Sequence, residues 1–213
     1  MPRTPDPTIR SRILDAADRL LARLGFRRMT VGDIAAEAGI GKGSVYLHFD
    51  GKEDVALSCI DRMADRVVAR LEILTAPPAP ATERLRAMLR ARVLVRFDYA
   101  RRHARSIDEK LAVMRQALLE RRARHFNDEA AVLDRVVDEG RRSGELASAP
   151  PHPGRALVTA TNALLPYSLS AREIGHRAAL VRRTDEVIGL LLAGLAAPDP
   201  KHRPRRPRTR RNP

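Results

Sequence analysis

The sequence is poor in cysteine and in aromatic residues. Cys59 is the single cysteine, so no disulfide can form within the chain, and nothing in the sequence has the cysteine spacing of a metal site. Aromatic residues make up 3% of the 213 residues, and tryptophan is absent. Apolar residues reach 44%, which predicts a core of alanine, leucine and valine and favours helices over strands.

Long apolar runs are also missing. The first seven residues are polar and contain nothing like the apolar segment of a signal peptide. The longest apolar stretch, residues 187–197, has 11 residues, whereas a membrane span needs ~18 or more. The sequence therefore predicts a soluble protein of the reducing cytoplasm, without a membrane partner.

The chain has far fewer acidic than basic residues. The chain carries 40 Lys+Arg against 26 Asp+Glu, a formal net charge of +14, and only four of the basic residues are lysines. Such an excess predicts a polyanionic partner or a basic tail. Residues 1–58 have a net charge of only +1, whereas residues 198–213 carry +6. This proline-rich tail is expected to be disordered. It either keeps the protein solvated or binds nucleic acid without sequence preference.

Apolar residues recur three to four positions apart along nearly the whole chain, and no segment alternates with a period of two. The predicted fold class is all-α, with about nine helices. The prolines of residues 77–80 should end a long helix that begins near Gly51, and residues 140–154 should separate a long helix from the final pair. Those two helices are expected at 154–170, kinked or ended by Pro166, and at 177–197.

Residues 30–54 predict a helix-turn-helix. Thr30 and Asp33 form a capping box that starts a helix at Val31, and Gly39 suits the left-handed residue of a sharp turn. A second short helix is expected at about 41–47, with Val45 anchoring it. Asp50 and Glu53 are expected to form another capping box, which would place Lys52 beside a helix N-terminus where a phosphate can bind.

The polar residues of the second short helix match the needs of a helix in the major groove. Hydroxyl and imidazole groups suit phosphates, a cation suits a phosphate or a guanine edge, and a glycine allows close approach. These properties belong to Lys42, Gly43, Ser44, Tyr46 and His48.

Residues 30–53 resemble the N-terminal DNA-binding signature of the TetR (tetracycline repressor) family, because the helix-turn-helix is combined with Tyr46, Phe49 and Lys52-Glu53. The strong resemblance covers about residues 9–70. It implies that Lys42, Gly43 and Ser44 approach bases or phosphates, that Phe49 packs, and that the DNA backbone is held by Thr30, Tyr46, His48 and Lys52. Gly41 stands where a serine is frequent, and Leu47 where a polar or aromatic residue is common, so base preference cannot be transferred.

The expected domains are a helix-turn-helix DNA-binding domain at 1–54, a helical effector-binding and dimerisation domain at 55–197, and the tail at 198–213. The wide apolar surface of the last helices suggests a subunit interface, and the resemblance implies a four-helix homodimer contact there. It also implies a small-molecule effector among the middle helices. The candidate pocket residues are Phe97, Tyr99, Phe126, Asn162 and Tyr167.

Other classes of site are less well supported. His125 and Glu129 lie one helical turn apart, but without a third ligand they are expected on a solvated face or in ion pairs, and no metal or cofactor is predicted. The remaining histidines are expected at the surface, Cys59 is expected to pack partly buried, and no pattern of catalytic residues occurs. These histidines are His103, His152, His176 and His202.

The predicted function is a homodimeric, sequence-specific transcriptional regulator, a repressor released from a palindromic operator by a small molecule. The alternative is a protein whose basic tail binds nucleic acid without specificity.

Overall fold

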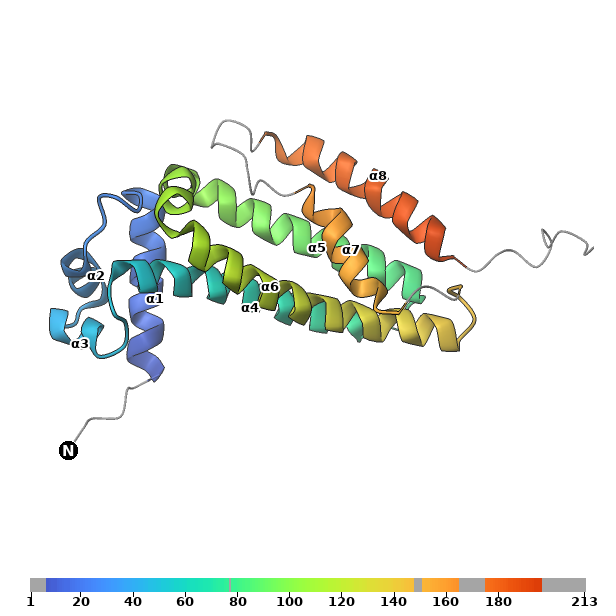
Figure 1. Cartoon of the computed structure of the whole chain (residues 1–213), viewed down its shortest axis with the longest axis horizontal. Coiled ribbons are helices and arrows are strands. Elements are labelled where there is room, and N and C mark those ends of the chain that lie inside the picture. Colours follow the sequence, from blue (N-terminus) through green and yellow to red (C-terminus); the bar gives the residue numbers. More distant parts are fainter. Residues whose placement is uncertain (1–6, 77, 148–150, 165–174, 197–213) are drawn as a thin grey trace, which may run out of the picture.

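The computed structural model of the chain describes residues 7–76, 78–147, 151–164 and 175–196, with the side chains of residues 105–115 excepted. These residues form eight helices (Figure 1), and their one β-feature is an isolated bridge between Leu146 and Ala196. The helices are α1 (Pro7–Arg23), α2 (Val31–Ala38), α3 (Lys42–Tyr46), α4 (Lys52–Thr75), α5 (Ala81–Arg102), α6 (Ala104–Arg142), α7 (Pro153–Asn162) and α8 (Arg177–Leu195). The predicted all-α class is confirmed, with eight described helices where about nine were expected.

Helices α1 to α3 gather at one end of the molecule, and α4 to α8 extend away from them as an elongated bundle (Figure 1). The small end has its own core, made by apolar faces of α1, α2 and α3 and by the first turns of α4. Its most buried members include Ile13, Leu21, Ile34, Val45 and Val55.

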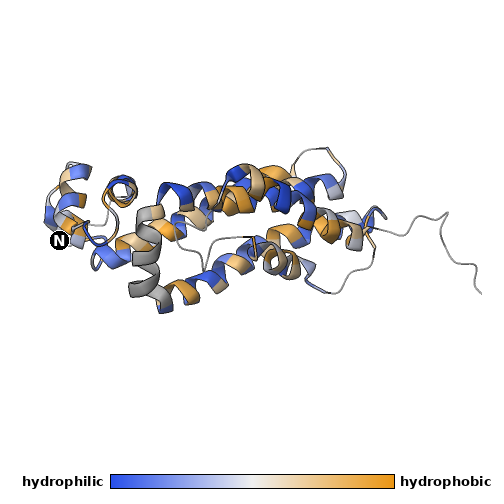
Figure 2. Cartoon of the chain, turned by 90° about the horizontal axis from the view of Figure 1, so that it is seen from above, coloured by the Kyte–Doolittle hydropathy of each residue, from blue (hydrophilic) through white to orange (hydrophobic). Residues whose placement is uncertain are grey.

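The larger core fills the bundle. Leu71 of α4, Leu85 and Leu89 of α5, and Leu133 of α6 are all fully buried in it. Figure 2 shows hydrophobic residues concentrated on the helix faces that meet inside the bundle. The predicted domain boundary after residue 54 falls inside α4, which contributes Val55 to the small core and Leu71 to the large one. One continuous helix therefore runs from the helix-turn-helix end into the bundle.

Helix α7 packs closely on α6 because Gly154 has no side chain. A Cβ atom at Gly154 would lie 2.3 Å from the carbonyl oxygen of Ala130, and the Gly154 amide donates a hydrogen bond of 2.6 Å to Asp134 Oδ1. Helix α7 ends at Asn162, so the helix expected over 154–170 is shorter than predicted within the described residues, and Pro166 lies outside them.

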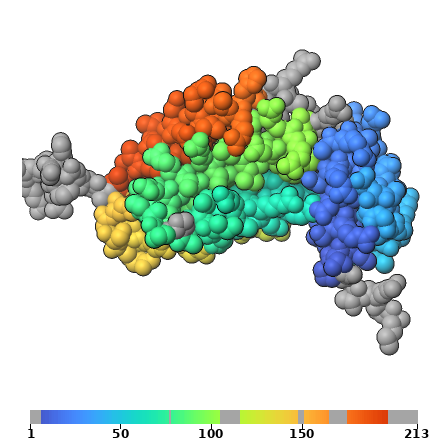
Figure 3. Space-filling view, turned by 180° about the vertical axis from the view of Figure 1, so that it is seen from behind, coloured from blue at the N-terminus to red at the C-terminus, as the bar shows by residue number. Residues whose placement is uncertain are grey.

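Helix α8 lies on the outside of the bundle, along α5 (Figures 1 and 3). Its inward stripe consists of Leu180, Thr184, Ile188 and Leu192. None of the other described helices covers the opposite face, on which Leu190 is 77% exposed.

Candidate nucleic-acid interface

The turn between α2 and α3 is built as the sequence predicts. Thr30 caps α2: its hydroxyl accepts from the Asp33 amide at 3.1 Å, and its own amide donates to the Asp33 carboxylate at 2.9 Å. Gly39 ends α2 in the left-handed conformation, with φ of 65°. Arg12 of α1 donates to the carbonyl oxygens of Ala38 and Gly39, at 2.7 and 3.3 Å. The capping box, the turn and α1 together fix the angle between the two short helices.

Helix α3 is anchored by one buried face. Val45 is fully buried, and Phe49 just beyond the helix is 3% exposed, with the Arg10 guanidinium 5.0 Å from its ring centre. Phe49 therefore packs, as expected. The N-cap of α3 is Gly41, whose lack of a side chain leaves the first turn without a side-chain cap.

The side chains predicted to meet DNA lie on the outer faces of this end. Thr30, Lys42, Gly43 and Tyr46 are exposed, and Ser44 and His48 are half-buried. Tyr46 keeps 52% of its surface in solvent, although an aromatic ring gains free energy by burial. Four of these six residues belong to α3, His48 follows α3 by two positions, and Thr30 caps the neighbouring helix α2.

Lys52, the seventh of them, is held by the protein itself. Its Nζ lies 3.3–3.4 Å from the carbonyl oxygens of Phe26, Arg27 and Met29 and 4.8 Å from the centre of the Phe26 ring. The lysine ties the start of α4 to the loop between α1 and α2, a contact that the sequence did not reveal.

The capping box predicted for Asp50 and Glu53 is wrong. Helix α4 starts at Lys52, its N-cap is Gly51, and no side chain caps it. The Asp50 amide instead donates to Asp54 Oδ2 at 3.4 Å. The extended backbone at Gly51, with φ of 172°, delays the helix by one residue and so shifts the capping register.

Ion pairs fasten the helix-turn-helix to its surroundings. Glu37 of α2 accepts from Arg19 and Arg23 of α1, at 2.8 and 3.1 Å, and these hydrogen bonds, first that of Arg19, lower the pKa of Glu37. Arg62 of α4 donates to Asp15 Oδ1 at 2.6 Å and to the Leu14 carbonyl oxygen at 3.0 Å. These contacts fasten α2 to α1 and α1 to α4.

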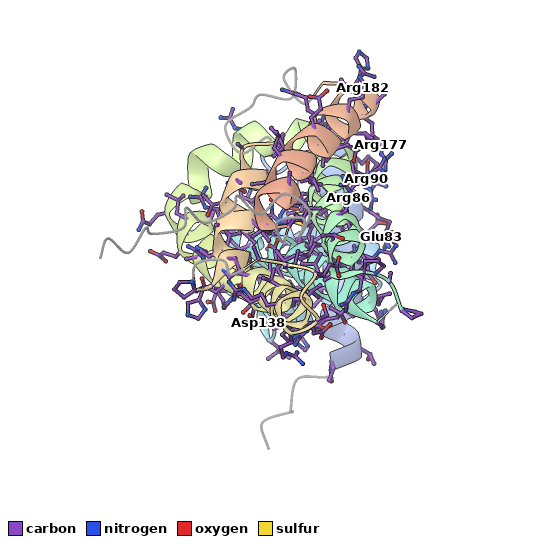
Figure 4. The ribbon with its side chains drawn as sticks, turned by 90° about the vertical axis from the view of Figure 1, so that its right-hand side faces the viewer. Glu83, Arg86, Arg90, Asp138, Arg177 and Arg182 are labelled. Atoms are coloured by element: carbon purple, nitrogen blue, oxygen red, sulfur yellow. The ribbon has the colours of Figure 1, made fainter. Side chains whose placement is uncertain are left out.

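Many arginines of the bundle lie far from this interface. Arg86 and Arg90 of α5 and Arg177 and Arg182 of α8 point outward on the same side of the bundle (Figure 4). Arg177 pairs with Asp98 at 3.2 Å and Arg90 with Asp185 at 3.6 Å. Two of these arginines thus form exposed ion pairs between α5 and α8, in which an aspartate offsets their charge.

The candidate effector residues that the structure describes lie in separate parts of the bundle. Phe97 packs with Val93 and Leu180, whereas Phe126 belongs to the large core. The Tyr99 ring stacks on His103 at 4.1 Å, and burial, followed by the charges of Cys59 and Asp18, raises the pKa of Tyr99 well above its ordinary value. Asn162 Oδ1 is buried without a hydrogen-bond partner among the described residues, and Tyr167 lies outside them.

A buried ionic cluster in the bundle was missed from sequence. Arg92 donates to Glu129 at 2.7 Å and to Thr161 Oγ1 at 2.6 Å, and Arg96 also donates to Glu129. All three ionic side chains are at most 5% exposed. The signal was available: Arg92 and Arg96 lie one turn apart on the face of α5 that carries Met88, Leu89, Val93 and Phe97.

The structure decides between the alternatives for His125 and corrects the surface position predicted for His103. His125 is buried and its Nε2 lies 2.9 Å from Asp61 Oδ1, so the ion-pair alternative is confirmed and the solvated face is wrong for both His125 and Glu129. His103, expected at the surface, is 1% exposed because the α5–α6 corner packs on α1. His152 and His176 are exposed as expected, and His202 lies outside the described residues.

Cys59 is fully rather than partly buried. Within the part of the chain that the structure describes, no three histidine, cysteine or acidic side chains are grouped to hold a metal ion. None of the described helices is both long and apolar enough to cross a membrane.

Comparison with known proteins bears on the same end of the chain. The sequence profile described as "Bacterial regulatory proteins, tetR family" matches residues 13–59. The chain is 30% identical over 137 residues to the fatty acid metabolism regulator protein of Bacillus subtilis, a match that covers 63% of this chain and 69% of the relative.

Solved structures extend the likeness in fold to the bundle. A transcriptional regulator from Cytophaga hutchinsonii superposes with a TM-score of 0.71 at 19% identity, covering 86% of this chain and 96% of the other. The regulator FadR from Bacillus subtilis, solved in complex with stearoyl-CoA, superposes with a TM-score of 0.60 at 22% identity, covering 87% and 98%.

Proposed function

The chain belongs to the tetR family of bacterial regulatory proteins and is a ligand-responsive, DNA-binding regulator of transcription, and we propose that it acts as a homodimeric repressor on a palindromic operator. The observation that carries the proposal is helix α3. It is anchored through Val45 and presents a glycine and several polar side chains outward. A short helix of this kind fits the major groove, where donors of different lengths reach base edges and phosphates.

The proposed roles follow from position. Lys42, Gly43 and Ser44 at the start of α3 approach bases or phosphates, and Thr30, Tyr46 and His48 hold the DNA backbone. Lys52 either adds a phosphate contact or, through its contacts with the 26–29 loop, sets the position of α1 relative to α4. We assign residues 1–54 to DNA binding and 55–197 to effector binding and dimerisation, joined by α4.

The outer face of α8 supports dimerisation. Leu190 is 77% exposed on it, Ala193 is also exposed, and no described residue lies within 4 Å of a Cβ position at Gly189 or Gly194. Each helical glycine costs up to ~1 kcal/mol relative to alanine, and the chain's own packing does not require either one. A second copy of α8 approaching closely would use both the glycines and the leucine, and would set two α3 helices about one turn of DNA, ~34 Å, apart.

Contacts between α4 and α6 offer a route from the bundle to the DNA. Asp61 of α4 pairs with Arg121 and His125 of α6, and Arg121 also reaches Asp54 in the first turn of α4 at 3.6 Å. A ligand that displaces α6 would therefore pull on α4 and, through Arg62, on α1. In a dimer this changes the separation of the two α3 helices, on which operator affinity depends.

For the effector we propose a fatty-acid derivative. The support is the relative with 30% identity, whose name assigns it to the regulation of fatty acid metabolism. The test is release of bound operator by acyl-CoA thioesters of increasing chain length, with free coenzyme A as the control. If none of the acyl-CoA thioesters releases the operator, fatty-acid derivatives are excluded as the effector, and the proposal of operator binding is unaffected.

Operator binding is tested by in vitro selection from random duplexes, followed by affinity measurements over a range of salt concentrations. We expect a palindromic consensus bound at least a hundredfold more tightly than random duplex, and a Tyr46→Ala variant that loses most of this preference. A chain ending at residue 197 should keep the preference and show a weaker salt dependence of non-specific binding. If the full chain binds the selected operator and random duplex with nearly equal affinity, the alternative is favoured, in which the basic tail binds nucleic acid without specificity.

A further inference from the structure

Leu47 is an exposed apolar residue in the middle of the proposed DNA-reading surface. It follows the last residue of α3 directly and keeps 66% of its surface in solvent. Its backbone is still helical, with φ of −70° and ψ of −19°. The rotation of ~100° per residue therefore applies to it as to the helix itself.

This rotation makes Leu47 one of the two residues that point most directly away from the protein. Val45 is fully buried and so defines the inward direction of α3. Gly43 and Leu47 lie two residues before and two after it, which places each ~160° from that direction. Lys42, Ser44 and Tyr46 lie at ~60–100° and so flank the outward line.

Gly43 clears the space beside Leu47. A Cβ atom at Gly43 would meet no atom of the described residues within 4 Å, so neither their packing nor a left-handed backbone requires glycine there. The outermost part of α3 thus consists of one residue without a side chain and, one turn later, an isobutyl group.

The chemistry of Leu47 selects its partner. An isobutyl group cannot pair with a phosphate or with the polar edge of a base, and the apolar group that a base pair offers in the major groove is the thymine methyl. We propose that Leu47 is a base-specificity residue that packs against a thymine methyl in each half of the operator. The inference rests on the proposed function, and it names a base preference that belongs to this chain, because the resemblance places a polar or aromatic residue at this position.

The experiment removes the thymine methyl groups from the selected operator and, separately, the Leu47 side chain from the protein. Deoxyuridine, which lacks the methyl group, replaces each thymine, and binding of the full chain and of Leu47→Ala is measured. We expect one thymine per half-site at which the replacement weakens binding of the full chain about fourfold, the effect of burying one methyl group, ~0.8 kcal/mol. The same replacement should leave binding of Leu47→Ala unchanged.

A matched control is Ile73→Ala, which truncates another exposed aliphatic side chain on α4, 62% exposed and distant from α3. It should respond to deoxyuridine as the full chain does. Equal sensitivity to every deoxyuridine in the full chain and in Leu47→Ala would overturn the role of Leu47 and leave the operator intact. Failure of the full chain to select any shared sequence would overturn the proposed function, and this inference with it.

Discussion

His103 lies against Asp18 in the joint between the bundle and the helix-turn-helix end. The imidazole Nε2 is 3.2 Å from Asp18 Oδ1 and 3.3 Å from the Asp18 carbonyl oxygen, and Nδ1 lies 2.8 Å from the carbonyl oxygen of Tyr99. The corner between α5 and α6 is thereby fastened to the middle of α1. A change in the bundle that moves this corner also moves the helix that supports α2 and α3.

Asp18 should make the stability of the protein sensitive to acid. Burial opposes ionisation of its carboxyl, but the hydrogen bond with His103 and the charges of His103, Arg62 and Arg102 outweigh it and lower the pKa of Asp18. A carboxyl with a lowered pKa in the folded state stabilises the fold above its unfolded pKa, ~3.9, and loses this contribution as the pH falls through the folded value.

The measurement is urea unfolding of the full chain and of Asp18→Asn between pH 2 and pH 7. We expect Asp18→Asn to be less stable near pH 6 and the difference to shrink steadily below about pH 4. The pKa of Asp33 is lowered by its hydrogen bonds with Thr30, so by the same reasoning Asp33→Asn should also differ from the full chain less at low pH, which gives a second case outside the joint. A difference between the full chain and Asp18→Asn that stayed constant with pH would contradict this account.

Gly43→Ala should separate folding from DNA binding. Alanine in a helix is favoured over glycine by up to ~1 kcal/mol, and the added methyl meets nothing within 4 Å, so the free energy of unfolding should rise. The same methyl points outward from α3 and would hold the DNA away, so operator affinity should fall at least tenfold. Thermal unfolding and operator titration of one preparation give both results. Operator affinity equal to that of the unchanged chain would show that Gly43 does not face DNA.

The local signals in the sequence were sufficient for the helix-turn-helix. The Thr30–Asp33 capping box, the left-handed Gly39 and the buried Val45 depend on residues within a few positions of one another, and all are as predicted. The start of α4 was misplaced by one residue because Asp50 and Gly51 are both acceptable N-cap residues, and backbone geometry decides between them.

Contacts between segments far apart in the sequence could not be predicted from such local signals. His103 meets Asp18 across 85 positions and Arg92 meets Glu129 across 37, and nothing in a helical periodicity states which faces will oppose each other. A charged residue within an apolar stripe indicates only that a partner is needed. Arg92 and Arg96 are such residues, and only the folded structure identifies Glu129 as their partner.

Removing Glu129 should destabilise the bundle strongly. Glu129→Leu leaves the buried guanidinium groups of Arg92 and Arg96 without the carboxylate that both now contact, and breaking such a cluster costs about 3–5 kcal/mol. Replacing all three residues, as Arg92→Met, Arg96→Leu and Glu129→Leu together, removes the charges as well as their partner. The triple variant should recover most of the stability in urea unfolding, because the Thr161 hydroxyl keeps its hydrogen bond to the Leu157 carbonyl oxygen. A triple variant no more stable than Glu129→Leu would mean that packing, not charge, dominates there.

Leu190→Glu should convert the protein to a monomer. On a monomer the change would be almost neutral, within about 0.5 kcal/mol, because the side chain is 77% exposed and lies on the outer face of α8. In a dimer built on that face it would bury two carboxylates against apolar surface, a cost that the contact cannot offset. Sedimentation at micromolar concentration should therefore show a dimer for the unchanged chain and for the control Ile73→Glu on α4, and a monomer with weakened operator binding for Leu190→Glu. A Leu190→Glu protein that stayed dimeric would place the subunit contact elsewhere than on this face.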